Sequence, residues 1–265
     1  MMQFQVDDLP MRAIDEGHGQ PLVFLHGFPL DHSMWDYQRR AFRANCRVLI
    51  PDQRGFGRTP AGERQATIDQ FAADVAGLLD AAGVHQPVVL CGLSMGGCVT
   101  LAFAHRYPER LKALILCDAR AATDTPEQAA NRLKLAERVL TEGPRIVAEA
   151  MLPRLFAAAT NERQPRIVDA VRNVILATSA RGIAGGLRAL AGRSDATPWL
   201  ASICVPALLI VGEEDIISPP AEMRGMAAAM PNGRCVIIPQ AGHMAPLEQP
   251  EPVNAAIQEF LAQLA

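Results

Sequence analysis

The chain has 265 residues, of which 49% are hydrophobic and 20% are charged. This composition is typical of a globular protein that buries a large core without disulfides or metals, and it excludes a largely disordered chain. The formal net charge is -3, from 25 basic and 28 acidic side chains without any block of like charge, so nothing in the sequence indicates binding to nucleic acid or to a membrane surface.

The opening segment predicts a strand pair and no targeting signal. Residues 3–6 and 11–14 have the pattern of a short antiparallel hairpin. The segment MMQFQVDDLPMR contains two acids and lacks the apolar core of a signal peptide. No apolar run in the chain reaches the length of about 18 residues that spans a bilayer. We therefore expect a cytoplasmic protein.

Six apolar runs rich in Val, Ile and Leu follow, and each of them ends at Gly, Asp or Pro. They cover residues 21–26, 47–51, 87–91, 111–117, 207–211 and 235–239. Near-continuous apolar strands are typical of a sheet that is covered on both faces. The sequence therefore predicts an α/β protein with a mostly parallel, doubly wound sheet.

Helical patterns separate these runs. Thr67 and Gln70 form a T-x-x-Q capping box before an apolar stripe that extends to Leu79, and Gly83 supplies a stop. This helix is expected to lie against the sheet. A second apolar stripe, behind Pro252, predicts that the chain closes with an amphipathic helix.

The long segment between the fourth and fifth runs contains helix starts and stops but no convincing strand. We predict a helical cap at residues 119–198 and a core made of residues 1–118 and 199–265. The first expected cap helix starts at Pro126 and ends at Gly143-Pro144. Three more are expected at residues 146–156, 167–178 and 183–190. The last of them is the weakest, because Gly185 and Gly186 interrupt it.

The run at residues 87–91 leads into Gly92-Leu93-Ser94-Met95-Gly96 and then into a helical pattern. In such a strand, sharp turn and helix, a Cβ on either glycine would collide with the neighbouring strand or helix, whereas the serine is exposed at the apex. Ser94 is therefore the predicted nucleophile.

A serine hydroxyl is a poor nucleophile until a base takes its proton. Among the six histidines, His243 follows the last predicted strand, on a loop directly before the closing helix region. That loop reaches the carboxyl edge of the sheet. His85 and His105 are expected to be solvated or capping groups, so His243 is the predicted base.

The base in turn needs a carboxylate that fixes its tautomer and stabilises the imidazolium. Glu213, Glu214 and Asp215 follow the penultimate core strand, and Asp118 has a similar place after the preceding strand. Asp215 gives the chain order Ser, Asp, His. The two glutamates and Asp118 remain its rivals on position alone.

The oxyanion of the reaction needs two donors that are in place before the reaction begins. The loop at residues 26–29 follows the first long strand, and its Phe28 amide, together with the amide of Met95 after the serine, is the predicted pair. The side chain of His26 is expected to brace this loop through hydrogen bonds. Residues 52–57 are expected to fix a loop as well.

Five segments together resemble the α/β-hydrolase superfamily, namely HGFPLDHSMW, DQRGFGRT, CGLSMGG, VGEED and QAGHMAPLEQP. Within it, the chain is similar to small carboxylesterases, 3-oxoadipate enol-lactonases and cofactor-free haloperoxidases. The resemblance implies an α/β-hydrolase fold and a G-x-x-D turn whose last acid, Asp215, is the catalytic one. The serine at the sharp turn also separates the chain from haloalkane dehalogenases and epoxide hydrolases, which have an aspartate nucleophile at that position.

Together these features predict a carboxylic-ester hydrolase that cleaves a small ester or lactone through an acyl-enzyme on Ser94, with no metal or organic cofactor. The expected partner is a small-molecule substrate. C–C bond hydrolysis, perhydrolysis and acyl transfer are alternatives, since they use the same triad. An alternative of another class is a weakly active ligand-binding receptor, which a simple ester assay would distinguish.

The substrate pocket is expected to be narrow and apolar, and thus to favour short acyl or aryl esters. Its predicted lining comes from the second cap helix and the residues next to the triad, namely Met151, Leu152, Leu155, Phe156, Met244, Phe28 and Met95. Arg120, Arg154 and Arg188 are candidates for anchoring a substrate carboxylate, although each is also typical of a solvated residue.

The six cysteines are scattered, mostly within apolar runs, and none has the spacing of a metal site. We expect buried free thiols.

Overall fold

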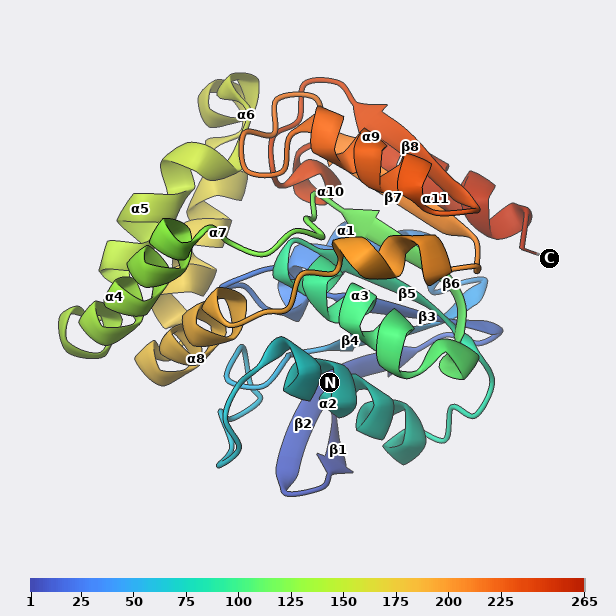
Figure 1. The fold of residues 1–265 in the computed structure, drawn as a ribbon, viewed down its shortest axis with the longest axis horizontal. Coiled ribbons are helices and arrows are strands. Elements are labelled where there is room, and N and C mark those ends of the chain that lie inside the picture. The colour runs from blue at the N-terminus through green and yellow to red at the C-terminus, as the bar shows by residue number, and fades with distance from the viewer. Residues whose placement is uncertain (265) are drawn as a thin grey trace.

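The protein is built around one eight-stranded sheet, as a computed structural model that describes residues 1–264 shows (Figure 1). In chain order the strands are β1 Met2–Val6, β2 Leu9–Glu16, β3 Gln20–Leu25, β4 Cys46–Pro51, β5 Val88–Leu93, β6 Leu111–Cys117, β7 Ala207–Gly212 and β8 Gly233–Ile238. Their order across the sheet is β1-β2-β4-β3-β5-β6-β7-β8. The pairs β1/β2 and β2/β4 are antiparallel and all others are parallel, which confirms the predicted opening hairpin and the mostly parallel sheet.

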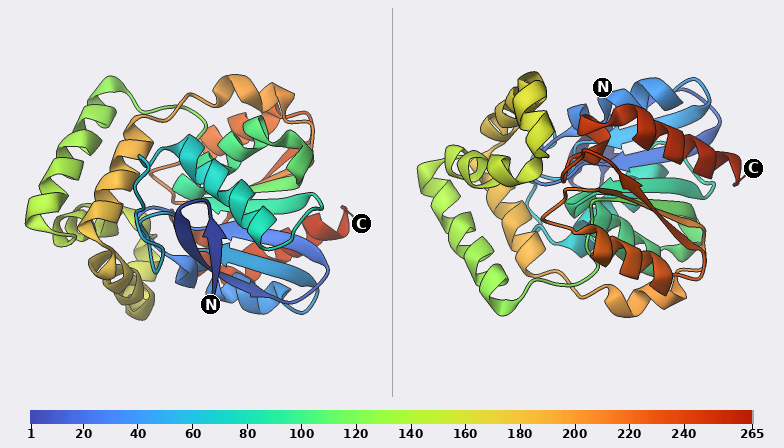
Figure 2. Two further views of the ribbon diagram at one scale, coloured as in Figure 1. Left: turned by 90° about the horizontal axis from the view of Figure 1, so that it is seen from below. Right: turned by 90° about the horizontal axis from the view of Figure 1, so that it is seen from above.

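Helices cover both faces of the sheet, which explains why its central strands are apolar throughout. All residues of β5 and β7 are buried, whereas most of the edge strand β8 is half-buried. Figure 2 shows two helices on one face, α1 (Asp36–Phe42) and α11 (Pro250–Ala262). The opposite face carries α2 (Ile68–Ala81), α3 (Met95–Arg106) and α9 (Pro220–Ala229). Short helical turns complete the core at η1 (His32–Trp35), η2 (Pro108–Arg110), η3 (Thr197–Ser202) and α10 (Ala245–Glu248).

The N-terminus of α2 follows the sequence prediction only in part. The Thr67 side chain accepts a hydrogen bond from the Gln70 amide, as a helix cap does. The Gln70 side chain, however, donates to Asp74 one turn further on. Asp74 also pairs with the buried guanidinium of Arg54. The reciprocal half of the predicted capping box is therefore wrong, because this buried ion pair offers the Gln70 amide a stronger acceptor.

A helical insertion between β6 and β7 lies beyond one end of the sheet, at the left of Figure 1. Its helices are α4 Pro126–Glu142, α5 Arg145–Leu155, α6 Ala158–Arg163, α7 Pro165–Ala177 and α8 Ala180–Ala191. The predicted insertion is thus observed, with the short helix α6 in addition. Its delimitation as a cap at residues 119–198 stays a prediction.

The helix predicted to be weakest, α8, is complete, and its glycines have a packing reason. A Cβ on Gly182 would run into the carbonyl of Gly55. One on Gly186 would meet the rings of Phe56, at 2.7 Å, and Phe28, at 2.8 Å. Because α8 lies so close to these core loops, packing against them outweighs the low helix propensity of glycine.

Two further expectations concern membrane spans and thiols. Within residues 1–264, no single helix is long and apolar enough to cross a membrane; α7 and α8 meet that criterion only as a pair, which is bent by 99° between them. Cys46, Cys91 and Cys117 are buried free thiols as expected. Cys98 and Cys235 are only half-buried and Cys204 is exposed, so the expectation is wrong for these three.

Candidate active site

Ser94 lies between the end of β5 and the start of α3, at a turn with unusual backbone geometry. Its φ of 51° and ψ of -109° place a residue other than glycine in a sparsely populated region, as is frequent at functional sites. The Ser94 amide donates to the carbonyl of Cys117, which ties the turn to β6. A Cβ on Gly92 would run into the Gly96 carbonyl, and one on Gly96 into that of Leu25. The close approach of these backbones forces the turn that presents Ser94.

The loop between β8 and α10 brings His243 to this serine. The Ser94 hydroxyl lies 2.9 Å from Nε2 of His243, and Nδ1 of the same ring lies 2.8 Å from Oδ2 of Asp215. A carboxylate only accepts hydrogen bonds, so Nδ1 carries the proton and Nε2 is free to accept that of the serine. Both His243 and Asp215 are buried, whereas Ser94 is partly exposed. The three side chains form one hydrogen-bonded chain, and its Ser94 end is partly exposed.

Asp215 is held in place by the turn that follows β7. Its Oδ1 accepts the amides of Ile217, at 2.7 Å, and Ser218, at 3.0 Å, which leaves Oδ2 for the histidine. The rivals named from the sequence, Glu213 and Glu214, are exposed. Of the four acids considered, Asp215 alone is hydrogen bonded to His243 within residues 1–264.

Asp118 has a different place in the network. Its Oδ1 accepts the amide of Gly212, at 2.8 Å, and its carbonyl accepts the hydroxyl of Ser218. Burial, and after it the negative charge of Asp215, raises the pKa of Asp118 well above its usual value. Asp118 therefore supports the strand end that carries Asp215 without contacting the imidazole itself.

The loop that carries Phe28 passes beside the serine. A Cβ on Gly27 would lie 3.6 Å from Cβ of Ser94. Among the described residues, neither the Phe28 amide nor the Met95 amide donates a hydrogen bond to another protein group. Both N–H groups are thus unpaired near the serine, which agrees with their predicted role as oxyanion donors; that role stays a prediction.

Hydrogen bonds between His26 and Gln53 hold this loop in place. The Gln53 amide donates to Nε2 of His26 at 3.0 Å, and the Gln53 side chain donates to the His26 carbonyl at 2.7 Å. Burial lowers the pKa of His26, so the ring stays neutral and keeps Nε2 as an acceptor. These bonds match the bracing role expected for His26.

A second brace joins the loop after Phe28 to the loop after β4. Asp52 accepts the amide of His32, its ring Nδ1 and the amide of Arg58, at 2.9, 2.7 and 2.8 Å. The hydrogen bond to Asp52 raises the pKa of His32. Together with Asp31, these side chains form the one cluster of possible metal ligands found within residues 1–264. Asp31, however, caps η1 through Ser33, so all three side chains already serve the loops.

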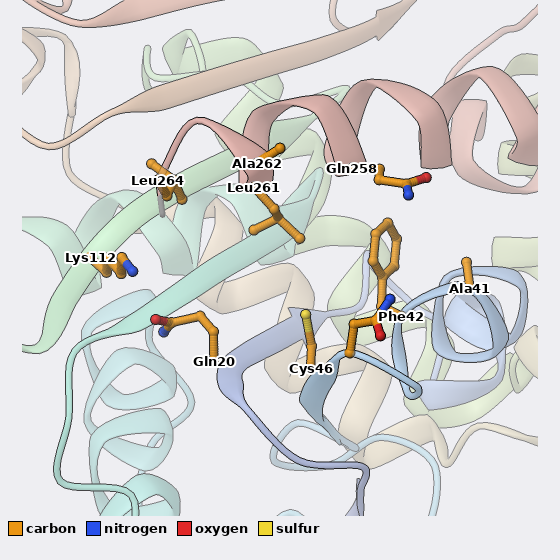
Figure 3. Close-up of a pocket in the computed structure, with 10 residues that line it drawn as sticks. Gln20, Ala41, Phe42, Cys46, Lys112, Gln258, Leu261, Ala262 and Leu264 are labelled. Carbon is orange, nitrogen blue, oxygen red and sulfur yellow. The ribbon is translucent and has the colours of Figure 1, made fainter.

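A cavity of about 340 Å³ lies away from Ser94 (Figure 3). It is lined by Gln20, Cys46 and Lys112, which lie at the amino ends of their strands, and by the last turns of α11. Ser94 lies at the carboxyl end of β5. The cavity is therefore at the opposite edge of the sheet from the serine and does not lead to it.

A second cavity, about 310 Å³, is closer to the site. It lies between α7 and the η1 to α1 segment, and its lining includes Leu30, from the loop that carries Phe28, and Leu247, from α10, which follows the loop of His243. It does not include Ser94 itself.

Some of the residues predicted to line the substrate pocket lie next to the loop of His243. Leu155, Phe156 and Met244 are buried and Met151 is half-buried. The Leu155 carbonyl accepts the amide of His243 at 2.9 Å, so the end of α5 lies directly against this histidine. A contact between any of these side chains and a substrate stays a prediction.

Two of the three candidate anchoring arginines are already paired with acids. Arg120 bonds to Glu222 and Arg188 to Glu137, while Arg154 is exposed. These ion pairs do not favour a role for Arg120 or Arg188 in anchoring the carboxylate of a substrate.

Sequence reasoning missed Glu248, a buried carboxylate close to His243. It accepts hydrogen bonds from both neighbours of His243, Gly242 and Met244. Burial raises the pKa of Glu248 above its usual value, although its hydrogen bonds act in the opposite direction. The available signal was an acid directly after the apolar stretch MAPL that follows the histidine.

Comparison with known proteins agrees with this architecture. Residues 20–250 match the family described as alpha/beta hydrolase fold. An esterase structure from Thermogutta terrifontis is 42% identical, with a TM-score of 0.96 over 99% of this chain and 98% of that one. The enol-lactonase structure from Burkholderia xenovorans LB400 is 32% identical, with a TM-score of 0.91 over 98% of this chain and all of that one.

Sequence comparison also finds an enol-lactonase among the similar proteins. The 3-oxoadipate enol-lactonase 2 of Acinetobacter baylyi is 30% identical over 242 residues, which cover 91% of this chain and 88% of that one. The family match covers well over half of the chain, and the eight-stranded sheet with its helical insertion agrees with it. The predicted resemblance is thus confirmed: the chain belongs to the α/β-hydrolase family and is esterase- and lactonase-like.

Proposed function

We propose that the chain is a serine hydrolase that cleaves small carboxylic esters or lactones through an acyl-enzyme on Ser94. The observation that carries this proposal is the hydrogen-bonded chain from the Ser94 hydroxyl through His243 to Asp215. This is the arrangement that activates a serine and holds its base in the productive tautomer.

Acylation follows from the positions of these groups. Oγ of Ser94 attacks the carbonyl carbon of the substrate while its proton passes to Nε2 of His243, and Asp215 stabilises the resulting imidazolium. The amides of Phe28 and Met95 hold the oxyanion of the tetrahedral intermediate. The intermediate then expels the alcohol, which takes the proton from His243.

Deacylation uses the same groups in reverse order. Water attacks the acyl-serine, gives its proton to Nε2 of His243, and the carboxylic acid leaves as the Ser94 hydroxyl is restored. In a lactone the leaving alcohol stays attached to the acyl chain, so a single hydroxy acid is released.

Two observations support an ester or lactone as the substrate. The structures that it resembles include an esterase and an enol-lactonase, at 42% and 32% identity. Leu155 and Phe156, whose backbone contacts the loop of His243, and Met244, which follows the histidine, are uncharged. An apolar site of this kind suits a small neutral acyl group.

The substrate range provides the test. We expect kcat/KM for p-nitrophenyl acetate or butyrate to exceed that for the decanoate or palmitate by at least about tenfold, because the proposed pocket lies between the serine and the insertion and offers no open groove to a long chain. Initial rates across the acyl series measure this. Phe156→Ala is expected to reduce the preference. A higher kcat/KM for the long-chain esters would contradict the closed pocket, and no turnover of any ester or lactone would contradict the proposed function.

A further inference from the structure

Glu248 is buried at the end of α10, five positions after the base, with only 2% of its surface exposed. Its carboxylate accepts four hydrogen bonds, all of them from uncharged donors. A buried anion is costly unless such donors replace its hydration. The four donors therefore offset the free-energy cost of burying the Glu248 carboxylate.

The two oxygens of Glu248 bind different parts of the chain. Oε1 accepts the amides of Gly242, at 2.8 Å, and Met244, at 3.2 Å, which flank His243. Oε2 accepts the amide of Ala157, at 2.8 Å, and the hydroxyl of Thr160, at 2.7 Å, which belong to the α5 to α6 connection and the start of α6. One side chain thus joins the loop of the base to the helical insertion.

The histidine itself completes this junction. Its amide donates to the Leu155 carbonyl at 2.9 Å. A Cβ on Gly242 would lie 2.7 Å from the Ala157 nitrogen and 2.8 Å from the carbonyl carbon of Phe156, so the two backbones are in direct contact. Three consecutive residues of the base loop are therefore fastened to residues 155–160.

Only a carboxylate can make this junction. It has two oxygens that both accept, whereas a glutamine amide has one accepting oxygen and an NH₂ group that donates. In Glu248→Gln, one pair of donors would face the NH₂ group and lose its acceptor. Either the base loop or the insertion would then be released.

We propose that Glu248 is a positioning residue, which fastens the loop of His243 to residues 155–160 of the insertion and so fixes the imidazole within reach of Ser94. This inference rests on the proposed function, since the position of His243 matters to turnover only if it is the base. It implies that the base and the end of α5, where the predicted pocket residues Leu155 and Phe156 lie, form one unit.

The test compares Glu248→Gln with Glu214→Gln. Glu214 accepts an amide of the same segment, that of Ala158 at 3.3 Å, but its side chain is exposed. Because a displacement of about 1 Å can cost a hundredfold in rate, we expect Glu248→Gln to lower kcat for p-nitrophenyl butyrate by about 30- to 100-fold, with KM changed by less than about threefold. Glu214→Gln is expected to keep both constants, and Thr160→Val, which removes one of the four donors, to lie between them.

Titration of the active serine with a p-nitrophenyl phosphonate separates positioning from loss of fold. We expect Glu248→Gln to bind one phosphonyl group per chain, as the wild type does, but to react with it more slowly. The proposal would be overturned if the loss of kcat in Glu248→Gln were no larger than its loss of titratable serine. It would also be overturned if Glu248→Gln and Glu214→Gln had the same kcat and KM.

Ser94→Ala, assayed in parallel, distinguishes the two proposals. If Ser94→Ala is inactive and Glu248→Gln behaves as the wild type, only the positioning role fails. If Ser94→Ala keeps its activity, the proposed function fails and the positioning role with it.

Discussion

Ser94→Ala is expected to lower kcat by at least about a thousandfold for any ester that the wild-type protein hydrolyses. Alanine removes the atom that forms the acyl-enzyme, while His243, Asp215 and the two predicted oxyanion amides remain. What is left is attack by water on a bound ester, without covalent catalysis. Initial rates under saturating p-nitrophenyl butyrate measure the loss.

Ser202→Ala is the control for this variant, because Ser202 is an exposed serine at the end of η3. It is expected to keep the wild-type kcat. Melting curves of both variants should stay close to that of the wild type, which excludes unfolding as the cause. More than about a tenth of the wild-type kcat remaining in Ser94→Ala would contradict a covalent role for this serine.

Asp215→Asn is expected to have the next largest effect, a loss of about a hundredfold to ten-thousandfold in kcat. The asparagine oxygen can replace Oδ1 and accept the amides of Ile217 and Ser218, which leaves the amide NH₂ facing Nδ1 of His243. The ring must then accept at Nδ1 and carry its proton on Nε2, the tautomer that cannot take the proton of Ser94. Steady-state kinetics with the same ester measure this loss.

Two carboxylates nearby offer matched controls for Asp215→Asn. Glu214→Gln changes an exposed acid one position away and should leave kcat unchanged. Asp118→Asn keeps an oxygen for the Gly212 amide, so we expect a loss below about tenfold. A larger loss in Asp118→Asn than in Asp215→Asn would transfer the role of the acid to Asp118.

Features that depend on neighbouring residues in the sequence were predictable. The strands of the parallel sheet are short apolar runs because helices bury both of their faces, so the runs could be located without the fold. The turn at Ser94 could be located because its two glycines flank the serine in the sequence, although only Gly92 is required by a contact within the turn, and Gly96 is required by the carbonyl of Leu25 in β3.

Features that depend on distant contacts could not be predicted. The Gln70 side chain bonds to Asp74 because Arg54, from another loop, fixes that carboxylate. The glycines of α8 weakened its prediction, yet they allow it to pack on the rings of Phe28 and Phe56.

Glu248 illustrates the same limit at the candidate site. Its partners Ala157 and Thr160 lie some ninety positions away in the sequence, at separations of 91 and 88 residues. Only the folded chain shows that this acid joins the insertion to the base.

Mapping the adduct of a p-nitrophenyl phosphonate tests the central claim, that Ser94 is the nucleophile, most directly. The reagent phosphonylates an activated serine, and peptide mass mapping of the intact chain identifies the residue that carries the group. We expect one phosphonyl group per chain, on the peptide that contains Ser94, and none in Ser94→Ala. An adduct on another residue, or equal labelling of Ser94→Ala, would contradict the claim.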